Sequence, residues 1–332
     1  MKKLVFRWET ALLAMLVLEL AVFGLINPRF LNPANLIYGT SDFVQIGIVA
    51  LPLTLVIIAG GIDVSFASVI GLAAIVFGVA NFFGVPLPLA IGLALGVGAL
   101  CGAFNAAIIH LSKIQPLVVT LGSLYLFQGT ATVVSGLVGA GGYEGIGNFP
   151  EAFNAFGYAE VAGLPASLVL FLGLAGLLIL LLHFTRFGRS VFLCGQSDKA
   201  ARFAGIAVTR VQSLTYVAIG ACAAVAGLVM SAYFGSARVD LGAQTLLPAV
   251  TAAVLGGASI YGGRGSIIGT LLATFVIGYF QQGLQAIGVP SQISSALSGG
   301  LLVMAVALRH ASTVLTDVIA VARQSKARLA VK

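Results

Sequence analysis

The segment Arg186–Arg210, RFGRSVFLCGQSDKAARFAGIAVTR, decides how this chain is folded and oriented. It is the one long interior stretch rich in basic residues, and an apolar segment of membrane-spanning length lies on each side of it. Basic residues concentrate in cytoplasmic loops of membrane proteins, so we expect this segment to lie in the cytoplasm. Its polar start, Ala-rich centre and Gly205-Ile206 predict a small amphipathic helix held against the membrane. Such an element indicates a soluble partner on that side.

The composition predicts an all-α polytopic membrane protein. The chain has 332 residues, of which 59% are hydrophobic and only 8% are charged. A soluble domain of this length needs more charge to cover its surface. Membrane β-barrels need alternating apolar and polar residues, whereas these runs are apolar on every side. We therefore expect one transmembrane domain over residues 1–332.

Apolar runs of about 20 residues span a bilayer as helices, and about ten can be placed. The first is a retained helix, because Asn27-Pro28-Arg29 follows it instead of a small-residue cleavage site. An even count with the N-terminus inside returns the C-terminus to the cytoplasm, with a cytoplasmic loop at 184–212 and a tail at 310–332. The predicted spans are 8–26, 42–59, 64–81, 87–110, 116–137, 163–183, 213–234, 241–257, 266–284 and 291–309.

The charges agree with this orientation. All of the 17 Lys and Arg residues except Arg29 and Arg238 fall on the predicted cytoplasmic side. The long loop 138–162 carries three glutamates and no basic residue, as an external loop should. A nucleic-acid groove would gather basic residues on one face, so the formal charge of +7 reflects membrane topology and no nucleic-acid partner is expected.

Two segments resemble each other in their glycine pattern. Pro52 lies eight residues before Gly60-Gly61, and Pro248 lies eight before Gly256-Gly257. Both predict a helix, a glycine-rich break and a second helix. The similarity fits an internal duplication of the kind found in transporters, or the general frequency of Gly and Pro in membrane helices.

The sequence contains no recognisable catalytic motif. There is no HExxH and no GxSxG, and the three cysteines have no metal-ligand spacing. The glycine-rich stretch 256–265 lacks the Lys and Ser/Thr of a phosphate loop. We therefore expect no catalytic residue, metal or cofactor in this chain, and any dependence on ATP must come from a partner.

The break Gly60–Ser65 is the sharpest polar feature inside the apolar region. One interpretation is a broken helix whose backbone groups and Asp63 line a cavity. The other is a tight cytoplasmic hairpin in which Asp63 or Ser65 caps the next helix.

Uncharged polar residues within the predicted helices could bind a crossing solute or hold helices together. The motifs Gly92xxxGly96 and Gly98xxxGly102 predict close helix packing. There is no intramembrane charge pair of the kind that ion-coupled carriers use. The candidate pathway or gate residues are Asp63, Asn105, Gln128, Gln281 and Gln285.

Three stretches carry a family resemblance: IIAGGIDVSFASVIGLAA at 57–74, GQSDKAARFAGIAV at 195–208 and VLGGASIYGGRGSIIGTLLA at 254–273. Together they resemble the membrane permeases of bacterial ABC sugar importers of the ribose/xylose/arabinose type, over roughly 10–308. The stretches at 41–66, 142–150, 233–244 and 281–299 are similar to the D-type permeases of that family that import autoinducer-2, a small sugar-like signal.

That resemblance implies a non-catalytic multi-pass permease of the bacterial inner membrane that forms half of a translocation pathway. Its implied partners are two ATP-binding subunits, a paralogous C-type permease as heterodimer partner, and a periplasmic substrate-binding protein. Lys199 stands where the general importer motif has Glu. The implied coupling residues that contact the ATP-binding subunit are Gly195, Asp198, Ala200, Ala201, Arg202, Gly205 and Ile206.

Two other classes of function remain as alternatives. An ion-coupled secondary transporter of a small polar solute would act alone and would need a buried charge. A membrane-embedded enzyme or an assembly scaffold would transport no solute.

Overall fold

The computed structural model describes residues 8–141, 144–290, 293, 294, 296, 297, 299, 300, 303 and 304. Apart from one short hairpin, β1 (Glu160–Val161) and β2 (Leu164–Pro165), the regular elements within them are helices, which confirms the nearly all-α prediction. The predicted span 291–309 falls largely outside the described residues, and the predicted tail 310–332 lies outside them entirely.

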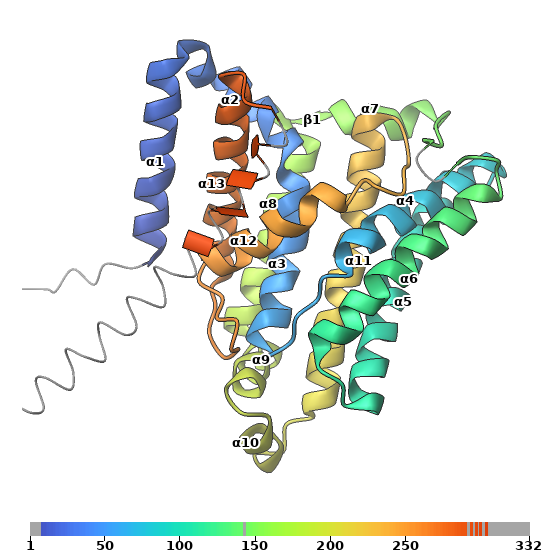
Figure 1. Ribbon diagram of the computed structural model, residues 1–332, viewed down its shortest axis with the longest axis vertical. Helices are drawn as coiled ribbons and strands as arrows, with labels where there is room; N and C mark the ends of the chain where they lie inside the picture. The colour runs from blue at the N-terminus through green and yellow to red at the C-terminus, as the bar shows by residue number, and fades with distance from the viewer. Residues whose placement is uncertain are drawn as a thin grey trace, which may run out of the picture.

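Six helices in the described part are long and apolar enough to cross a membrane, and a bent pair could make a seventh (Figure 1). The bent pair joins the Pro33–Asp42 segment to α3 (Val44–Ile58) at an angle of 59°. The six are α1 (Trp8–Ile26), α5 (Leu87–Ser112), α6 (Pro116–Gly136), α8 (Ala166–Phe184), α11 (Val208–Phe234) and α13 (Ile267–Ala286). The remaining elements are η1 (Pro28–Leu31), α2 (Pro33–Tyr38), η2 (Gly39–Asp42), α4 (Phe66–Phe82), α7 (Glu151–Tyr158), α9 (Arg186–Gln196), α10 (Asp198–Phe203), η3 (Ala243–Thr245) and α12 (Leu246–Leu255).

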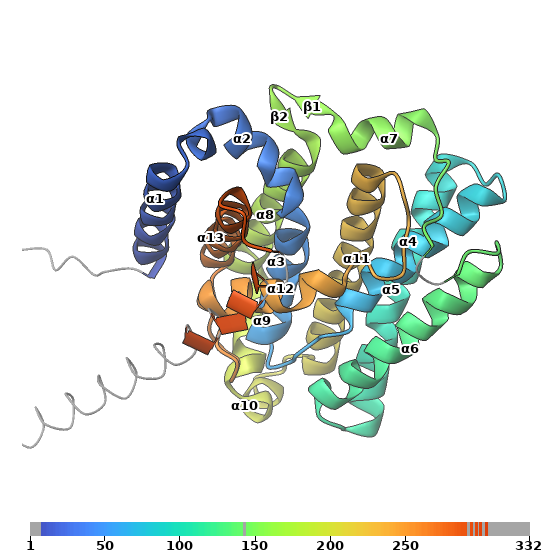
Figure 2. The same cartoon turned by 45° about the horizontal axis from the view of Figure 1, so that its top comes forward.

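Besides α3 of the bent pair, two of the predicted spans are helices too short to cross a membrane by themselves. Helix α4 has 17 residues and α12 has 10. At a rise of about 1.5 Å per residue they reach only about 26 and 15 Å, less than the roughly 30 Å hydrocarbon core. A glycine break lies next to each of them. Gly60, with φ +85°, lies between the end of α3 and the start of α4, and Gly257, with φ +106°, follows the end of α12. Helix α12 runs across the bundle rather than along it (Figures 1 and 2).

The core is built around α3 and α4. Every residue of α3 except Gln45 is buried, and Phe66 and Phe77 of α4 are fully enclosed. Helices α5, α6, α8, α11 and α13 surround this pair. Helix α1 lies at the edge against α13, and its outer face exposes Val17 and Leu18. An exposed apolar face of this kind is what a lipid-facing helix requires.

Glycines set the contact between α5 and α11. A methyl group on Gly98 would overlap the Gly220 carbonyl, and one on Gly102 would overlap the Tyr216 carbonyl. This confirms the packing predicted for Gly98xxxGly102. Gly92 and Gly96 make no such contact with the described part of this chain.

Candidate functional site: a polar cleft and a docking element

Helices α9 and α10, with the turn that ends at Ile206, form a compact projection that we call the docking element. Thr185 caps α9 by accepting a hydrogen bond from the Gly188 N–H at 3.2 Å. Ser197 is extended and caps α10 by accepting one from the Ala200 N–H at 3.3 Å. Capping residues of this kind satisfy amide groups that the helix itself leaves unpaired. The sequence predicted one small helix here, and the structure has two.

The coupling residues expected from the sequence lie mostly on the surface of this projection. Ala201 is buried and anchors α10, and Gly195 and Ile206 are half-buried. Gly205 has φ +77° and turns the chain out of α10. The exposed members are Asp198, Ala200, Arg202 and Gly205.

Sequence reasoning missed Phe203, the last residue of α10. This residue is 94% exposed, the highest value among the large apolar residues that the structure describes. Aromatic side chains contribute strongly to protein interfaces, so this exposed ring is a candidate contact residue. The signal was available, because Phe203 is the only aromatic residue between Ser197 and Val208.

A thiol lies buried at the base of the docking element. Burial raises the pKa of Cys194, the Asp198 carboxylate raises it further, and the Arg202 guanidinium lowers it. The pKa of this thiol therefore depends on the charges of Asp198 and Arg202 in α10.

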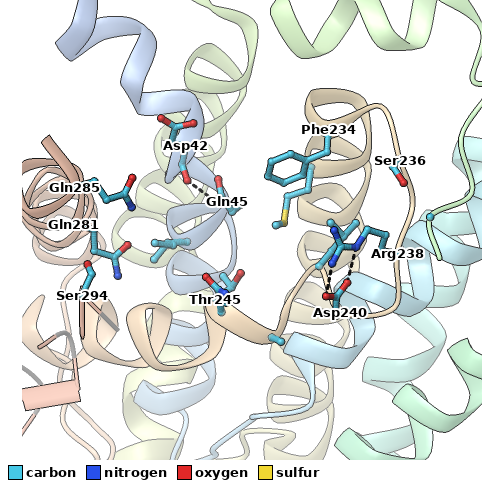
Figure 3. Close-up of a pocket in the computed structure, with 16 residues that line it drawn as sticks. Asp42, Gln45, Phe234, Ser236, Arg238, Asp240, Thr245, Gln281, Gln285 and Ser294 are labelled. Carbon is cyan, nitrogen blue, oxygen red and sulfur yellow. Dashed lines mark hydrogen bonds and ion pairs between the residues drawn. The ribbon is translucent and has the colours of Figure 1, made fainter. Parts of the chain in front are cut away.

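A polar cleft of about 700 Å³ opens between α3, α11, the loop after α11 with η3, and α13. In Figure 3, Gln281 and Gln285 project from α13 on one side, and Arg238 and Asp240 lie on the opposite side, in the loop after α11. The lining residues are Asp42, Gln45, Ile46, Gly145, Met230, Phe234, Ser236, Arg238, Asp240, Leu241, Ala243, Gln244, Thr245, Gln281, Gln285 and Ser294.

Charge in the cleft is partly neutralised by a fork-shaped ion pair. Arg238 donates from Nε to Asp240 Oδ1 at 2.9 Å and from Nη2 to Asp240 Oδ2 at 2.6 Å. This contact raises the pKa of the Arg238 guanidinium above its already high ordinary value. Across the cleft, the Tyr233 hydroxyl donates to Asp42 Oδ1 at 2.8 Å. Amides, hydroxyls and one paired cation suit a small polar solute with several hydrogen-bonding groups.

The five pathway candidates from the sequence do not lie together. Gln281 and Gln285 line the cleft. Asp63 and Asn105 belong to a separate buried network, and Gln128 is half-exposed on α6, away from both.

The buried network holds the Gly60–Ser65 break in place. Asp63 accepts hydrogen bonds from the N–H and hydroxyl of Ser65, at 2.8 and 2.7 Å, immediately before α4 begins. Asn105 of α5 donates to the Ser65 hydroxyl at 2.8 Å. Asp63 is only 2% exposed, whereas Gly60 at the start of the break is exposed, so the break runs from the surface into the protein. The carboxylate does organise the start of α4, as the second interpretation expected.

The Ile62 carbonyl extends this network to two more helices. It accepts hydrogen bonds from Thr120 of α6 and Tyr216 of α11, each at 3.3 Å. Irregular backbone at membrane depth is tolerated when protein groups satisfy it, which these contacts do.

Several apolar helices around a polar cleft define a multi-pass membrane permease. Residues 35–306 match the family model described as branched-chain amino acid transport system / permease component, and the chain belongs to that family. It is a multi-pass protein of the bacterial inner membrane.

Close relatives cover nearly the whole chain. It is 57% identical over 305 residues to the "Autoinducer 2 import system permease protein LsrD" of Enterobacter sp. (strain 638), covering 92% of this chain and 93% of the relative. It is 56% identical over 310 residues to the protein of the same name from Klebsiella pneumoniae, covering 93% of each. A solved metal-chelate type ABC transporter in an inward-facing conformation aligns with a TM-score of 0.51 at 15% identity, over 90% of this chain and 98% of that one, which shows a shared fold alone.

Proposed function

We propose that this chain is the membrane permease subunit of a bacterial ABC importer that carries autoinducer-2 across the inner membrane. The observation that carries the proposal is the 57% identity over 92% of the chain to an autoinducer-2 import permease. The polar cleft supports it, because its amides and hydroxyls can bind the hydroxyl groups of a small sugar-like molecule.

The proposed assembly pairs this chain with a paralogous C-type permease as a heterodimer. Two ATP-binding subunits bind below the pair, and a periplasmic substrate-binding protein delivers the solute from above. In this arrangement the chain is a single domain over 1–332 with about ten membrane helices. Its termini, the loop 184–212 and the tail 310–332 lie in the cytoplasm.

The proposed mechanism is alternating access. The partner hydrolyses ATP and moves the docking element, and the cleft then changes the side of the membrane to which it is open. Gln281 and Gln285 contact the solute in the cleft, whereas Asp63 and Asn105 hold the break before α4 in its buried position.

The proposed contact with the ATP-binding subunit centres on Phe203. The exposed neighbours Asp198, Ala200, Arg202 and Gly205 surround it on the docking element. An aromatic anchor within a polar rim is the usual form of a protein interface.

Uptake tests the proposed function directly. We expect proteoliposomes containing the chain, its paralogue and the ATP-binding subunits to accumulate labelled autoinducer-2 only when ATP and the binding protein are supplied. Uptake that follows a proton or sodium gradient without ATP would instead establish an ion-coupled carrier. No uptake under either condition would leave a scaffold as the better description.

Co-purification tests the docking assignment separately. Phe203→Ala removes the exposed ring, and we expect it to reduce the amount of ATP-binding subunit recovered with the permease at least tenfold, since aromatic anchors contribute about 2 kcal/mol or more. Ala201→Arg and Gly205→Arg should have the same effect. Phe83→Ala is the matched control, because this ring is also exposed but lies in the turn between α4 and α5. Unchanged recovery with all three docking variants contradicts the assignment.

A further inference from the structure

The docking element touches the end of α3 through bare backbone. A methyl group on Gly195 of α9 would overlap both the Ile58 carbonyl at the end of α3 and the Gly263 amide nitrogen. The Gly263 N–H donates to the same Ile58 carbonyl at 2.9 Å. Three segments far apart in the sequence therefore meet around one carbonyl oxygen.

Two further glycines complete this contact. Gly262 has φ +82°, and a methyl group there would press on the Gly195 carbonyl and the Gly60 Cα. We call Gly60, Gly195, Gly262 and Gly263 the glycine junction. Because the backbones touch without an intervening side chain at the glycines, a displacement of α9 would push directly on α3 and on the loop 256–266.

A side chain on α11 adds a second link. Gln212 Nε2 donates to the Ala59 carbonyl at 3.0 Å and to Asp198 Oδ1 at 3.3 Å. Ala59 directly follows α3 and is its C-cap, and Asp198 begins α10. The amide of Gln212 therefore ties the docking helix to the same end of α3 that the glycine junction holds.

The elements that meet at this end also build the cleft. At its other end, α3 follows Asp42 and carries Gln45, and both of these residues line the cleft. The loop 256–266 joins α12, preceded by the lining residue Gln244, to α13, which carries Gln285. Helix α3 is buried along its length, and densely packed interiors move as rigid bodies rather than compress.

We propose that Gln212 and the glycine junction transmit movement of the docking element to the polar cleft. Gln212 is a positioning residue in this scheme: it contacts no solute and acts through α3. The inference rests on the proposed function, because it requires a partner that moves the docking element.

The test measures movement at the cleft instead of uptake. Cys101, Cys194 and Cys222 are replaced by Ala, and Gln244→Cys supplies the only thiol of this chain, at an exposed cleft position. The complex with its ATP-binding subunits, in nanodiscs, is labelled with a membrane-impermeant maleimide, without nucleotide and after trapping with ATP and vanadate. In this parent we expect the labelling rate to differ between the two states.

The variants at position 212 separate the hydrogen bonds from the bulk of the side chain. Gln212→Glu has the same shape but places a carboxylate against a carbonyl and a carboxylate, and Gln212→Leu removes the donor without adding charge. Gln212→Lys keeps a donor for both acceptors. We expect the ratio of the two labelling rates to fall to about one in Gln212→Glu and Gln212→Leu, and to stay at the parent value in Gln212→Lys.

The outcomes separate the two proposals. The inference is supported if the ATP-binding subunit co-purifies with every variant and hydrolyses ATP, while only Gln212→Glu and Gln212→Leu lose the change in labelling rate at the cleft. Parent-like change in Gln212→Glu and Gln212→Leu overturns it, and so does a parent complex that hydrolyses ATP without any change at the cleft. Failure of the parent to retain an ATP-binding subunit overturns the proposed function itself.

Discussion

Thr54 of α3 and Thr270 of α13 share a hydrogen bond of 2.7 Å between their hydroxyl oxygens, in the fully buried centre of the bundle. Each hydroxyl also contacts a carbonyl of its own helix: Thr54 that of Ala50 at 2.9 Å, and Thr270 that of Ser266 at 3.1 Å. The pair joins the two helices that begin or end at the polar cleft, so it fixes their relative position.

We expect this pair to contribute modestly to stability. A double-mutant cycle with Thr54→Val and Thr270→Val should give a coupling energy of about 0.6 kcal/mol, because interhelical hydrogen bonds in membranes have that average value. Reversible unfolding of the purified protein in mixed detergent micelles measures it. A coupling energy near zero would show that each hydroxyl is satisfied by its own helix alone.

The glycines of α5 give a prediction with an internal control. Gly102→Ala should destabilise the protein by about 1–3 kcal/mol, since the new methyl group must push α11 away. Gly92→Ala on the same helix has open space around it and should be neutral or stabilise by up to about 1 kcal/mol, because Ala favours the helical state. Thermal unfolding of the two variants compares them. Equal losses at both positions would refute the assigned packing of α5 on α11.

The glutamines of the cleft should affect solute affinity rather than folding. Gln285→Leu removes one neutral hydrogen-bonding group, worth about 1 kcal/mol, and should raise the apparent KM for uptake about fivefold. Gln128→Leu is the matched control, since this glutamine lies outside the cleft. A larger effect at position 128 than at position 285 would favour a pathway along α6.

Apolar run lengths and charge distribution predicted the long helices well, because membrane-spanning segments satisfy their backbone locally. The same measure placed a span at 241–257, where the structure has the 10-residue helix α12, and it placed one at 64–81, where α4 has nearly those bounds but only 17 residues. Their apolar residues are buried by other helices, and composition cannot distinguish burial in protein from burial in lipid. Glycine spacing has the same weakness: Gly98 and Gly92 look alike in sequence, but only Gly98 faces α11.

The candidate site was harder to predict, because its contacts join distant segments. The sequence singled out Asp63 and Asn105 as polar residues in apolar surroundings, but their meeting at Ser65 depends on how α5 packs against the break. Nothing in the local pattern distinguishes Gln212, whose role arises from acceptors 153 and 14 residues away. Local polarity therefore found the candidates, and only the fold separated cleft residues from structural ones.

The pKa of the buried Cys194 thiol can be used to test the effect of the charges on the docking element, because charges of opposite sign shift it in opposite directions. Its raised pKa leaves less thiolate at neutral pH, so maleimide labelling in a Cys101→Ala, Cys222→Ala background should be slow. The rate should keep rising with pH beyond about 8.5, the ordinary pKa of a thiol.

Substitutions on α10 should then move this rate in opposite directions. Asp198→Asn removes the charge that raises the pKa of Cys194, so labelling at a fixed mildly alkaline pH should become faster. Arg202→Gln removes the charge that lowers this pKa, so labelling should become slower. Rates measured by mass spectrometry across the pH range separate a shifted midpoint from a change in access. If both variants accelerate labelling, local opening of α10 controls the thiol, and the electrostatic account of the docking element is wrong.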